Sequence, residues 1–229
     1  MTKTCFSTTP AELPTAALAT GEDDICGVRS AAMSGVTFEV ETTVPTEHGT
    51  FQFRAYRDLV SGSEHLAVVS GRPNDGCFVR VHSECLTGEV FKSQKCECGP
   101  QLDSALNTIN QYGGVVSYMR GHEGRGIGLV NNFKAYQLQE SGLDTLDANL
   151  ALGLPADGRD YSAAAAILHD LELHAVRLLT NNPDKIGQLT AHGITVLERV
   201  PLTAGAHPAN STYLRAKRDR MGHLLQHAS

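Results

Sequence analysis

The sequence predicts an α/β fold, with mixed α+β structure and a largely antiparallel sheet in the N-terminal half and an α/β layer in the C-terminal half. Apolar and polar residues alternate in short segments before Gly99, the first at residues 51–56, which is typical of antiparallel strands. After Gly99 the apolar spacing changes repeatedly between the strand and helix periods, which indicates parallel strands joined by helices. A chain of 229 residues, 41% of them hydrophobic, can bury the core of such a fold.

The elements follow from these patterns in chain order. The start of the chain is rich in Thr, Ala, Ser and Gly and has little periodicity, so we expect residues 1–40 to form a flexible N-terminal extension. Residues 41–229 are expected to form a single catalytic domain. Strands are predicted at residues 51–56, 66–70, 77–82, 114–119, 175–180 and 194–200. Helices are predicted at residues 101–112, 128–141, 162–171, 183–192 and 210–225.

Charge and composition exclude several classes of protein. The formal net charge of -6 argues against a broad basic face that binds nucleic acid. The sequence contains no run of roughly 18 apolar residues and no basic start followed by an apolar segment, so we expect a cytoplasmic protein without a membrane partner. Three of the six cysteines lie within residues 85–98, which favours metal binding by thiolates in a reducing compartment over a disulfide framework.

The clustered cysteines predict a metal site with an open coordination position. Cys96 and Cys98 are two residues apart, so in an extended segment both sulfurs point to the same side, and a hairpin would bring Cys85 beside them. Three protein ligands leave a fourth position in which zinc can activate a bound water to hydroxide. A structural site closed by His82, or reduced core cysteines without a metal, are the alternatives.

A glycine-rich segment at residues 120–129 lies between a predicted strand and a predicted helix. Glycines let the backbone approach a ligand there, and a helix N-terminus favours anions. Turn geometry alone also explains the glycines, whereas Arg120, Glu123 and Arg125 favour a binding role.

Two further segments lie at predicted helix starts. Asn182 and Pro183 fit a helix cap, but a cap does not explain Lys185, which we interpret as a phosphate contact at the strand ends. Asp157 and Arg159 precede the alanine-rich helix, where an N-cap is the simpler explanation if the residues are considered alone.

Five motifs then stand in a defined order. They are RVHSECLTG at residues 80–88, CECG at 96–99, GHEGRGIGL at 121–129, LTNNP at 179–183 and RVPL at 199–202. Together they resemble GTP cyclohydrolase II, and the similarity runs from about Val44 to Leu225, including MGHL at residues 221–224.

The resemblance implies a GTP cyclohydrolase II-like fold and a homodimeric enzyme of riboflavin synthesis. Such an enzyme converts GTP to a diaminopyrimidine ribosyl phosphate, formate and pyrophosphate. The resemblance implies one Zn²⁺ per chain on Cys85, Cys96 and Cys98, and Mg²⁺ with the GTP triphosphate. We expect a monofunctional form, because the segment before Val44 is too short for a fused dihydroxybutanone phosphate synthase.

The resemblance also assigns roles to individual residues. Tyr136 belongs at the catalytic centre, with Asp157 as base and Arg159 as the proposed nucleophile near the α-phosphate. An electrostatic role of Arg159 is the alternative, because a charged guanidinium is a poor nucleophile but pairs strongly with phosphate oxygens. The substrate-binding residues implied by the motifs are Arg80, Val81, His82, Ser83, Glu84, Gln101, Glu123, Gly124, Arg125, Thr145, Thr180 and Lys185.

The sequence departs from the family pattern at several positions. Glu89 and Glu97 stand where the family usually has Asp, Asn132 and Lys134 stand where Lys and Arg are more frequent, and Lys95 replaces an Arg. A divergent paralogue that retains the formyl group or acts on a different nucleotide is therefore an alternative. Tyr136 argues against formyl retention, because the known variant with that outcome carries methionine there. A regulatory or structural zinc module without catalysis is a third possibility.

Overall fold

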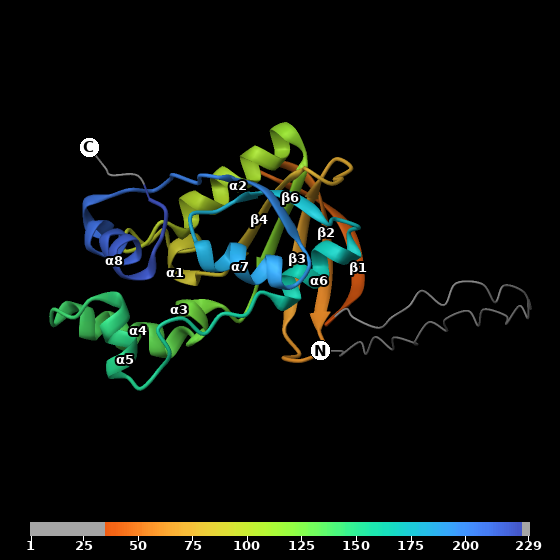
Figure 1. The fold of residues 1–229 in the computed structure, drawn as a ribbon. Coiled ribbons are helices and arrows are strands. Elements are labelled where there is room, and N and C mark those ends of the chain that lie inside the picture. The colour runs from red at the N-terminus through yellow and green to blue at the C-terminus, as the bar shows by residue number, and fades with distance from the viewer. Residues whose placement is uncertain (1–34, 226–229) are drawn as a thin grey trace, which may run out of the picture. The chain divides into compact units, whose positions relative to one another are not determined.

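One seven-stranded mixed sheet organises residues 35–225, which are the residues that the computed structural model describes (Figure 1). The strand order is β1-β2-β3-β5-β4-β6-β7. The strands are β1 (Val36–Thr46), β2 (Gly49–Asp58), β3 (Glu64–Ser70), β4 (Phe78–Ser83), β5 (Gly114–Met119), β6 (Ala175–Leu179) and β7 (Thr195–Val200).

The sheet changes from antiparallel to parallel at β5. Strands β1, β2 and β3 pair antiparallel in sequence order, and β3 pairs antiparallel with β5. Strand β4 lies between β5 and β6 and is parallel to both, while β7 is parallel to β6. The predicted antiparallel N-terminal half and α/β C-terminal half are confirmed, and they share a single sheet.

Helices cover both faces of this sheet and gather at one end of it. The main helices are α2 (Cys98–Tyr112), α4 (Leu129–Glu140), α5 (Thr145–Ala151), α6 (Ser162–Asp170), α7 (Pro183–Ala191) and α8 (Ser211–Met221). Short helical turns are α1 (Leu86–Glu89), α3 (Glu123–Gly126) and η1 (Pro208–Asn210). None of the helices within residues 35–225 has both the length and the apolar character that a membrane span requires.

Side-chain alternation along β3 separates two cores. Val68 points to the face covered by α2 and packs in a cluster with Ile109 of that helix. Val69, the next residue, points to the opposite face and belongs to the larger cluster that contains Ile167 of α6 and Leu189 of α7. The sheet is thus a rigid layer between helices, and its strand ends can hold side chains in fixed positions.

The carboxyl ends of the parallel strands β4, β5 and β6 meet at one edge of the sheet. Helices α1, α3, α4, α5 and α8 lie beyond this edge, on the left in Figure 1. Ligands of open α/β sheets bind outside the carboxyl ends of the strands. This edge is therefore the place where the fold presents a site.

Several elements differ from the prediction. Strand β1 begins at Val36, inside the stretch assigned to the extension, and the rest of that stretch, residues 1–34, lies outside the described part of the chain. Most β1 side chains are exposed, so the strand lacks the alternation that marks a buried face. Helix α5 was also not predicted. It begins at the cap residue Asp144, which accepts hydrogen bonds from the backbone N–H groups of Leu146 and Asp147.

Candidate active site

A pocket opens at the edge where β4, β5 and β6 end. Segments that directly follow these strands supply much of its wall, including Cys85 after β4, Glu123 after β5 and Lys185 after β6. The pocket holds about 910 Å³ of empty space, including space continuous with solvent. The crevice outside the carboxyl ends of the strands is the usual place for a ligand in open α/β sheets.

The three predicted metal ligands converge on one side of the pocket. The Sγ atoms of Cys85, Cys96 and Cys98 all lie within 4.8 Å of one another, and those of Cys85 and Cys96 are 3.7 Å apart. Zinc–sulfur bonds of about 2.3 Å in a tetrahedron place neighbouring sulfurs about 3.8 Å apart. The sulfur spacing therefore suits a shared zinc ion.

The local geometry of the cysteines differs from the expected extended segment. Cys98 is the first residue of α2, Glu97 is the residue before that helix, and Cys85 directly precedes the short helix α1. The sulfurs thus meet across two helix starts rather than along a strand and a hairpin.

Glycine makes this convergence possible. A Cβ atom on Gly88 would lie 2.7 Å from Cys96 Sγ and 3.4 Å from Cys85 Sγ. A Cβ atom on Gly99 would lie 2.5 Å from the carbonyl oxygen of Gly88. The distances of 2.7 Å and 2.5 Å are shorter than ordinary carbon contacts, so the turn closes around the sulfurs only without side chains at these positions.

The protonation chemistry of the cluster also fits a cation. Hydrogen bonds from Cys96 and Cys98 lower the pKa of the Cys85 thiol to about 2. The same contacts raise the pKa values of the Cys96 and Cys98 thiols, because one thiolate opposes a second negative charge nearby. A divalent cation favours all three thiolates and releases the remaining protons.

Glu89 organises the backbone around Cys85. Its Oε1 accepts a 2.8 Å hydrogen bond from the Cys85 backbone N–H and lies 2.8 Å from His82 Nε2. Its Oε2 accepts a 2.5 Å hydrogen bond from the Tyr118 hydroxyl. His82 is therefore engaged with Glu89, and the candidate metal group found among residues 35–225 contains the three cysteines without His82.

The wall next to the cysteines carries a buried carboxylate and a phenol. Glu123 Oε2 accepts from the Leu86 backbone N–H at 2.7 Å, and its Oε1 accepts from Asn132 Nδ2 at 3.2 Å. Burial raises the pKa of Glu123 and also that of Tyr136, which lines the same pocket. The Lys95 ammonium lies 4.8 Å from the centre of the Tyr136 ring. This wall can present hydrogen-bond acceptors and donors to a planar ring.

Three cations elsewhere in the pocket donate hydrogen bonds to neutral groups of the described residues. Arg80 donates to the Leu179 carbonyl and to Gln101 Oε1, both at 2.9 Å, and burial lowers the pKa of Arg80 to about 10. Lys185 Nζ donates to the Val81 carbonyl at 2.6 Å. Burial lowers the pKa of Lys185 as well, and an anionic ligand would favour the charged forms of both residues.

Arg125 is the third of these cations. Its guanidinium donates to the Thr145 carbonyl oxygen at 2.6 Å and to Thr145 Oγ1 at 2.8 Å. Its backbone has a φ of 66°, next to Gly124 with a φ of 60°. The left-handed turn directs the backbone of residues 124 and 125 along the pocket wall.

Asp157 and Arg159 form an ion pair beside the pocket. Arg159 Nε donates to Asp157 Oδ1 at 2.8 Å, and the guanidinium also contacts Oδ2. Although burial opposes the Asp157 charge, this pairing lowers the pKa of Asp157, and the pKa of Arg159 is raised. A guanidinium held in its charged form is a weak nucleophile, so the arrangement favours an electrostatic role of Arg159.

The structure brings most of the predicted site residues together. The predicted residues that line the pocket are Cys85, Cys96, Cys98, Arg80, His82, Ser83, Glu84, Gln101, Glu123, Gly124, Arg125, Tyr136, Thr145, Arg159, Thr180 and Lys185. Two predicted residues are not in the lining: the Val81 side chain is buried in the core, and Asp157 reaches the site through Arg159.

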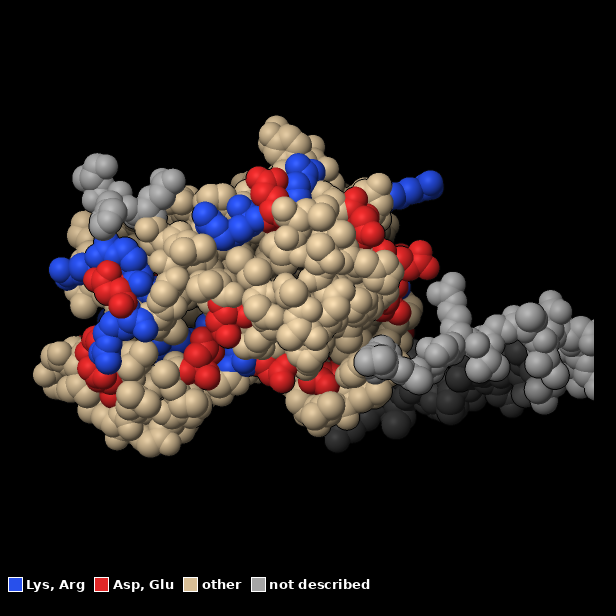
Figure 2. Space-filling model, in the orientation of Figure 1, with Lys and Arg blue, Asp and Glu red and all other residues tan. Residues whose placement is uncertain are grey.

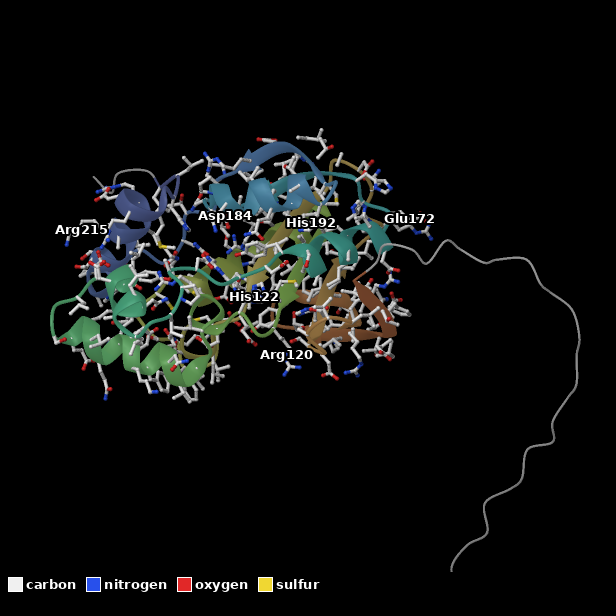
Figure 3. The ribbon with its side chains drawn as sticks, turned by 60° about the horizontal axis from the view of Figure 1, so that its bottom comes forward. Arg120, His122, Glu172, Asp184, His192 and Arg215 are labelled. Atoms are coloured by element: carbon white, nitrogen blue, oxygen red, sulfur yellow. The ribbon has the colours of Figure 1, made fainter. Side chains whose placement is uncertain are left out.

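Arg120 lies outside the pocket, although the sequence favoured a binding role for its positive charge. It is exposed and pairs with Glu64, and Figure 3 shows it at the edge of the molecule while His122 lies near the middle. Lys134 is exposed as well, whereas Asn132 is buried in the pocket wall. Of the departures from the family pattern, those at residues 97 and 132 line the pocket.

Other pocket residues were given no ligand-binding role by the sequence analysis. They are Glu97, His122, Asn181, Asn182, Tyr213, Lys217, His223 and Leu225. Asn181, Asn182 and His223 lie inside motifs that were recognised without a role for these side chains. Tyr213 and Lys217 fall in the helix predicted at residues 210–225, and only tertiary packing places them in the pocket.

Comparisons with known proteins agree with this geometry. The sequence profile described as GTP cyclohydrolase II matches residues 37–201. The riboflavin biosynthesis protein RibBA of Nocardia farcinica is 58% identical over 188 residues, which cover 81% of this chain and 45% of that protein. RibBA of Salinispora arenicola is 53% identical over 206 residues, which cover 89% of this chain and 49% of that protein. The chain therefore spans about half the length of these curated relatives.

Proposed function

The chain belongs to the GTP cyclohydrolase II family, and on this premise we propose that it hydrolyses GTP in a zinc-dependent reaction that opens the imidazole ring. The products are formate, pyrophosphate and a diaminopyrimidine ribosyl phosphate, as in the committed step of riboflavin synthesis. The observation that carries the proposal is the convergence of three cysteine sulfurs in a pocket that also contains Arg80 and Lys185.

Cys85, Cys96 and Cys98 would hold the zinc ion. When bound, the ion would supply the Lewis acidity that makes water a nucleophile at neutral pH. The protein itself fixes the sulfur positions through Gly88 and the Glu89 hydrogen bonds.

The guanine ring would lie against the wall that contains Glu123 and Tyr136. Glu123 is held by Leu86 and Asn132, so its carboxylate has a fixed direction and can accept from the amino and imino groups of guanine. Holding the base in one orientation in this way is the kind of positioning that accounts for a large part of many enzymatic rate enhancements.

The triphosphate would bind to the cationic side of the pocket. Arg80 and Lys185 make their protein hydrogen bonds to neutral oxygens, so their charges remain to be balanced by phosphate. Asp157 keeps Arg159 charged and oriented, which supports a role of Arg159 in stabilising negative charge at the α-phosphate. Asp157 acts as the partner that positions the guanidinium.

We further propose one zinc ion per chain, Mg²⁺ bound with the triphosphate, and a homodimer in the cytoplasm. These statements follow from the family. Oxygen ligands and retained waters are typical of Mg²⁺ sites, and the substrate phosphates would supply such oxygens.

Product identification tests the proposal. The purified protein is incubated with GTP and zinc, formate and pyrophosphate are assayed enzymatically, and the pyrimidine product is identified by mass spectrometry. Release of all three products supports the proposal, and tight GTP binding without turnover rejects it. A formylated pyrimidine without free formate would instead favour the divergent paralogue, for which the contact between Asn132 and Glu123 is the specific observation.

A further inference from the structure

His223 is a pocket residue with an unused hydrogen-bonding atom. Its side chain lines the pocket, and its Nε2 is buried from solvent without a hydrogen-bond partner among the described residues. A buried nitrogen of this kind costs free energy unless a partner is supplied. A ligand in the pocket is an available source of that partner.

The backbone around His223 is fixed on both sides. Helix α8 ends at Gly222, which adopts a left-handed conformation with a φ of 65°. The backbone N–H of His223 donates to the Lys217 carbonyl at 3.0 Å, and that of Leu224 donates to the Asn181 carbonyl at 2.9 Å. The imidazole is therefore placed by two separate elements, α8 and the loop after β6.

Side chains of helix α8 contact the neighbouring segments of the chain. Lys217 pairs with Glu97 at 2.6 Å, and Arg220 pairs with Asp147 of α5 at 2.7 Å. The sulfur of Met221 lies 3.4 Å from the Arg125 guanidinium. Figure 2 shows blue and red side chains side by side around this end of the molecule, as these ion pairs require.

The surroundings of His223 are mainly cationic. The charged groups with the strongest influence on it are Lys217, Arg159 and Lys185, together with the carboxylate of Asp157. Burial and these cations lower the pKa of His223 to about 3, so the imidazole is neutral at physiological pH. A neutral imidazole can donate one N–H, and an anion would be stabilised by the cations around it.

We propose that His223 is a substrate-binding residue that donates a hydrogen bond from Nε2 to the polyphosphate of a nucleoside triphosphate, beyond the α-phosphate. The C-terminal segment thereby distinguishes triphosphates from monophosphates. The imidazole lines the same pocket as Lys217, Arg159 and Lys185, whose charges act on it most strongly among the cations. The Glu123 carboxylate, by contrast, is held by Leu86 and Asn132, so His223 is assigned to the phosphate side. The inference rests on the proposed function, because it assigns a contact within the same pocket.

Calorimetric binding tests this assignment on the full chain with zinc present. The ligands are GMP and a GTP analogue with a methylene group between the α- and β-phosphates. We expect His223→Ala to weaken binding of the triphosphate analogue about tenfold, the size of one hydrogen bond to a charged group. Binding of GMP should change less than about twofold, and His223→Gln, which keeps an N–H near the Nε2 position, should restore most of the loss.

Leu224→Ala is the matched control, because its side chain is half exposed and is absent from the pocket lining. It should bind both ligands as the unaltered protein does. Equal weakening of both ligands by His223→Ala, or no change in either, would overturn the assignment. Since calorimetry needs no turnover, a protein that binds the analogue through His223 but releases no formate from GTP would refute the proposed function alone.

Discussion

Glu97, which lies between two of the predicted metal ligands, accepts a 2.6 Å hydrogen bond from Lys217 of helix α8. Both side chains are largely buried, with 3% of Glu97 and 12% of Lys217 exposed. The pair joins the cysteine-containing turn to a helix near the C-terminal end of the described chain. Helix α8 is therefore connected by a buried ion pair to the turn that carries Cys96 and Cys98.

Breaking this pair on one side should be strongly destabilising. Lys217→Met leaves the Glu97 carboxylate buried without its cation, and loss of one partner of a buried pair costs about 3–5 kcal/mol. The second oxygen of Glu97 already has no hydrogen-bond partner among the described residues. The free energy of unfolding, measured by urea titration, should fall by this amount. The double variant Glu97→Gln/Lys217→Met should lose less than the single variant, and equal losses would contradict a specific pair.

Gly88→Ala should impair metal binding rather than folding. The added methyl group would lie 2.7 Å from Cys96 Sγ, so the sulfurs must move apart. Disturbing groups that orient metal ligands typically lowers metal affinity about 10- to 100-fold, and we expect a loss of this size by competition with a zinc chelator. Gly187→Ala is the control, because its methyl group would meet no atom within 4 Å. Unchanged zinc affinity in Gly88→Ala would show that zinc binding does not require a glycine next to the sulfurs.

Replacement of Arg159 distinguishes an electrostatic role of this residue from a covalent role. If the guanidinium acts electrostatically, Arg159→Ala should lower kcat by about 100- to 1,000-fold, and Arg159→Lys should recover part of this loss. Steady-state formate release measures both values. Arg120→Lys is the control, because Arg120 is exposed and pairs with Glu64 outside the pocket. A Lys variant as inactive as the Ala variant would favour a covalent role.

The buried histidine His122 predicts a loss of stability in acid. Burial lowers its pKa to about 4 from an ordinary value of 6.5. The unfolded chain therefore binds a proton at a higher pH than the folded chain does. The contribution of neutral His122 to the free energy of unfolding is complete above pH 6.5 and is lost as the pH falls through 4. A shift of this size corresponds to about 3 kcal/mol. Urea titrations at several pH values should show a shallower acid decline for His122→Asn than for the unaltered protein and for the exposed control His192→Asn. Equal acid declines of the free energy of unfolding in all three proteins would contradict this role of His122.

The sequence predicted most of the sheet and the larger helices because their hydrophobic periods are strong. Strand β1 escaped because its side chains are mostly exposed, so no apolar face marks it. Helix α5 escaped because it has seven residues, too few for a clear period. The joining of both halves into one sheet depends on pairing between β3 and β5, which lie far apart in sequence and leave no local signal.

The site residues were predicted from sequence motifs. Motifs identify residues but do not show which side chains those residues contact in the folded protein. The cysteines were found from spacing alone, but the helix start at Cys98 and the need for glycine at residue 88 became visible only in three dimensions. Lys217 and His223 could not be assigned from sequence, because their pocket positions depend on how α8 packs against α5 and the loop after β6.

Zinc titration of the metal-depleted protein, with formate release from GTP measured at each step, tests the central claim most directly. We expect formate release to be absent without metal, to rise in proportion to bound zinc and to reach its maximum at one ion per chain. Cys96→Ser should show neither tight zinc binding nor release. Formate release that is independent of zinc, or full zinc binding with no formate from GTP, would contradict the account.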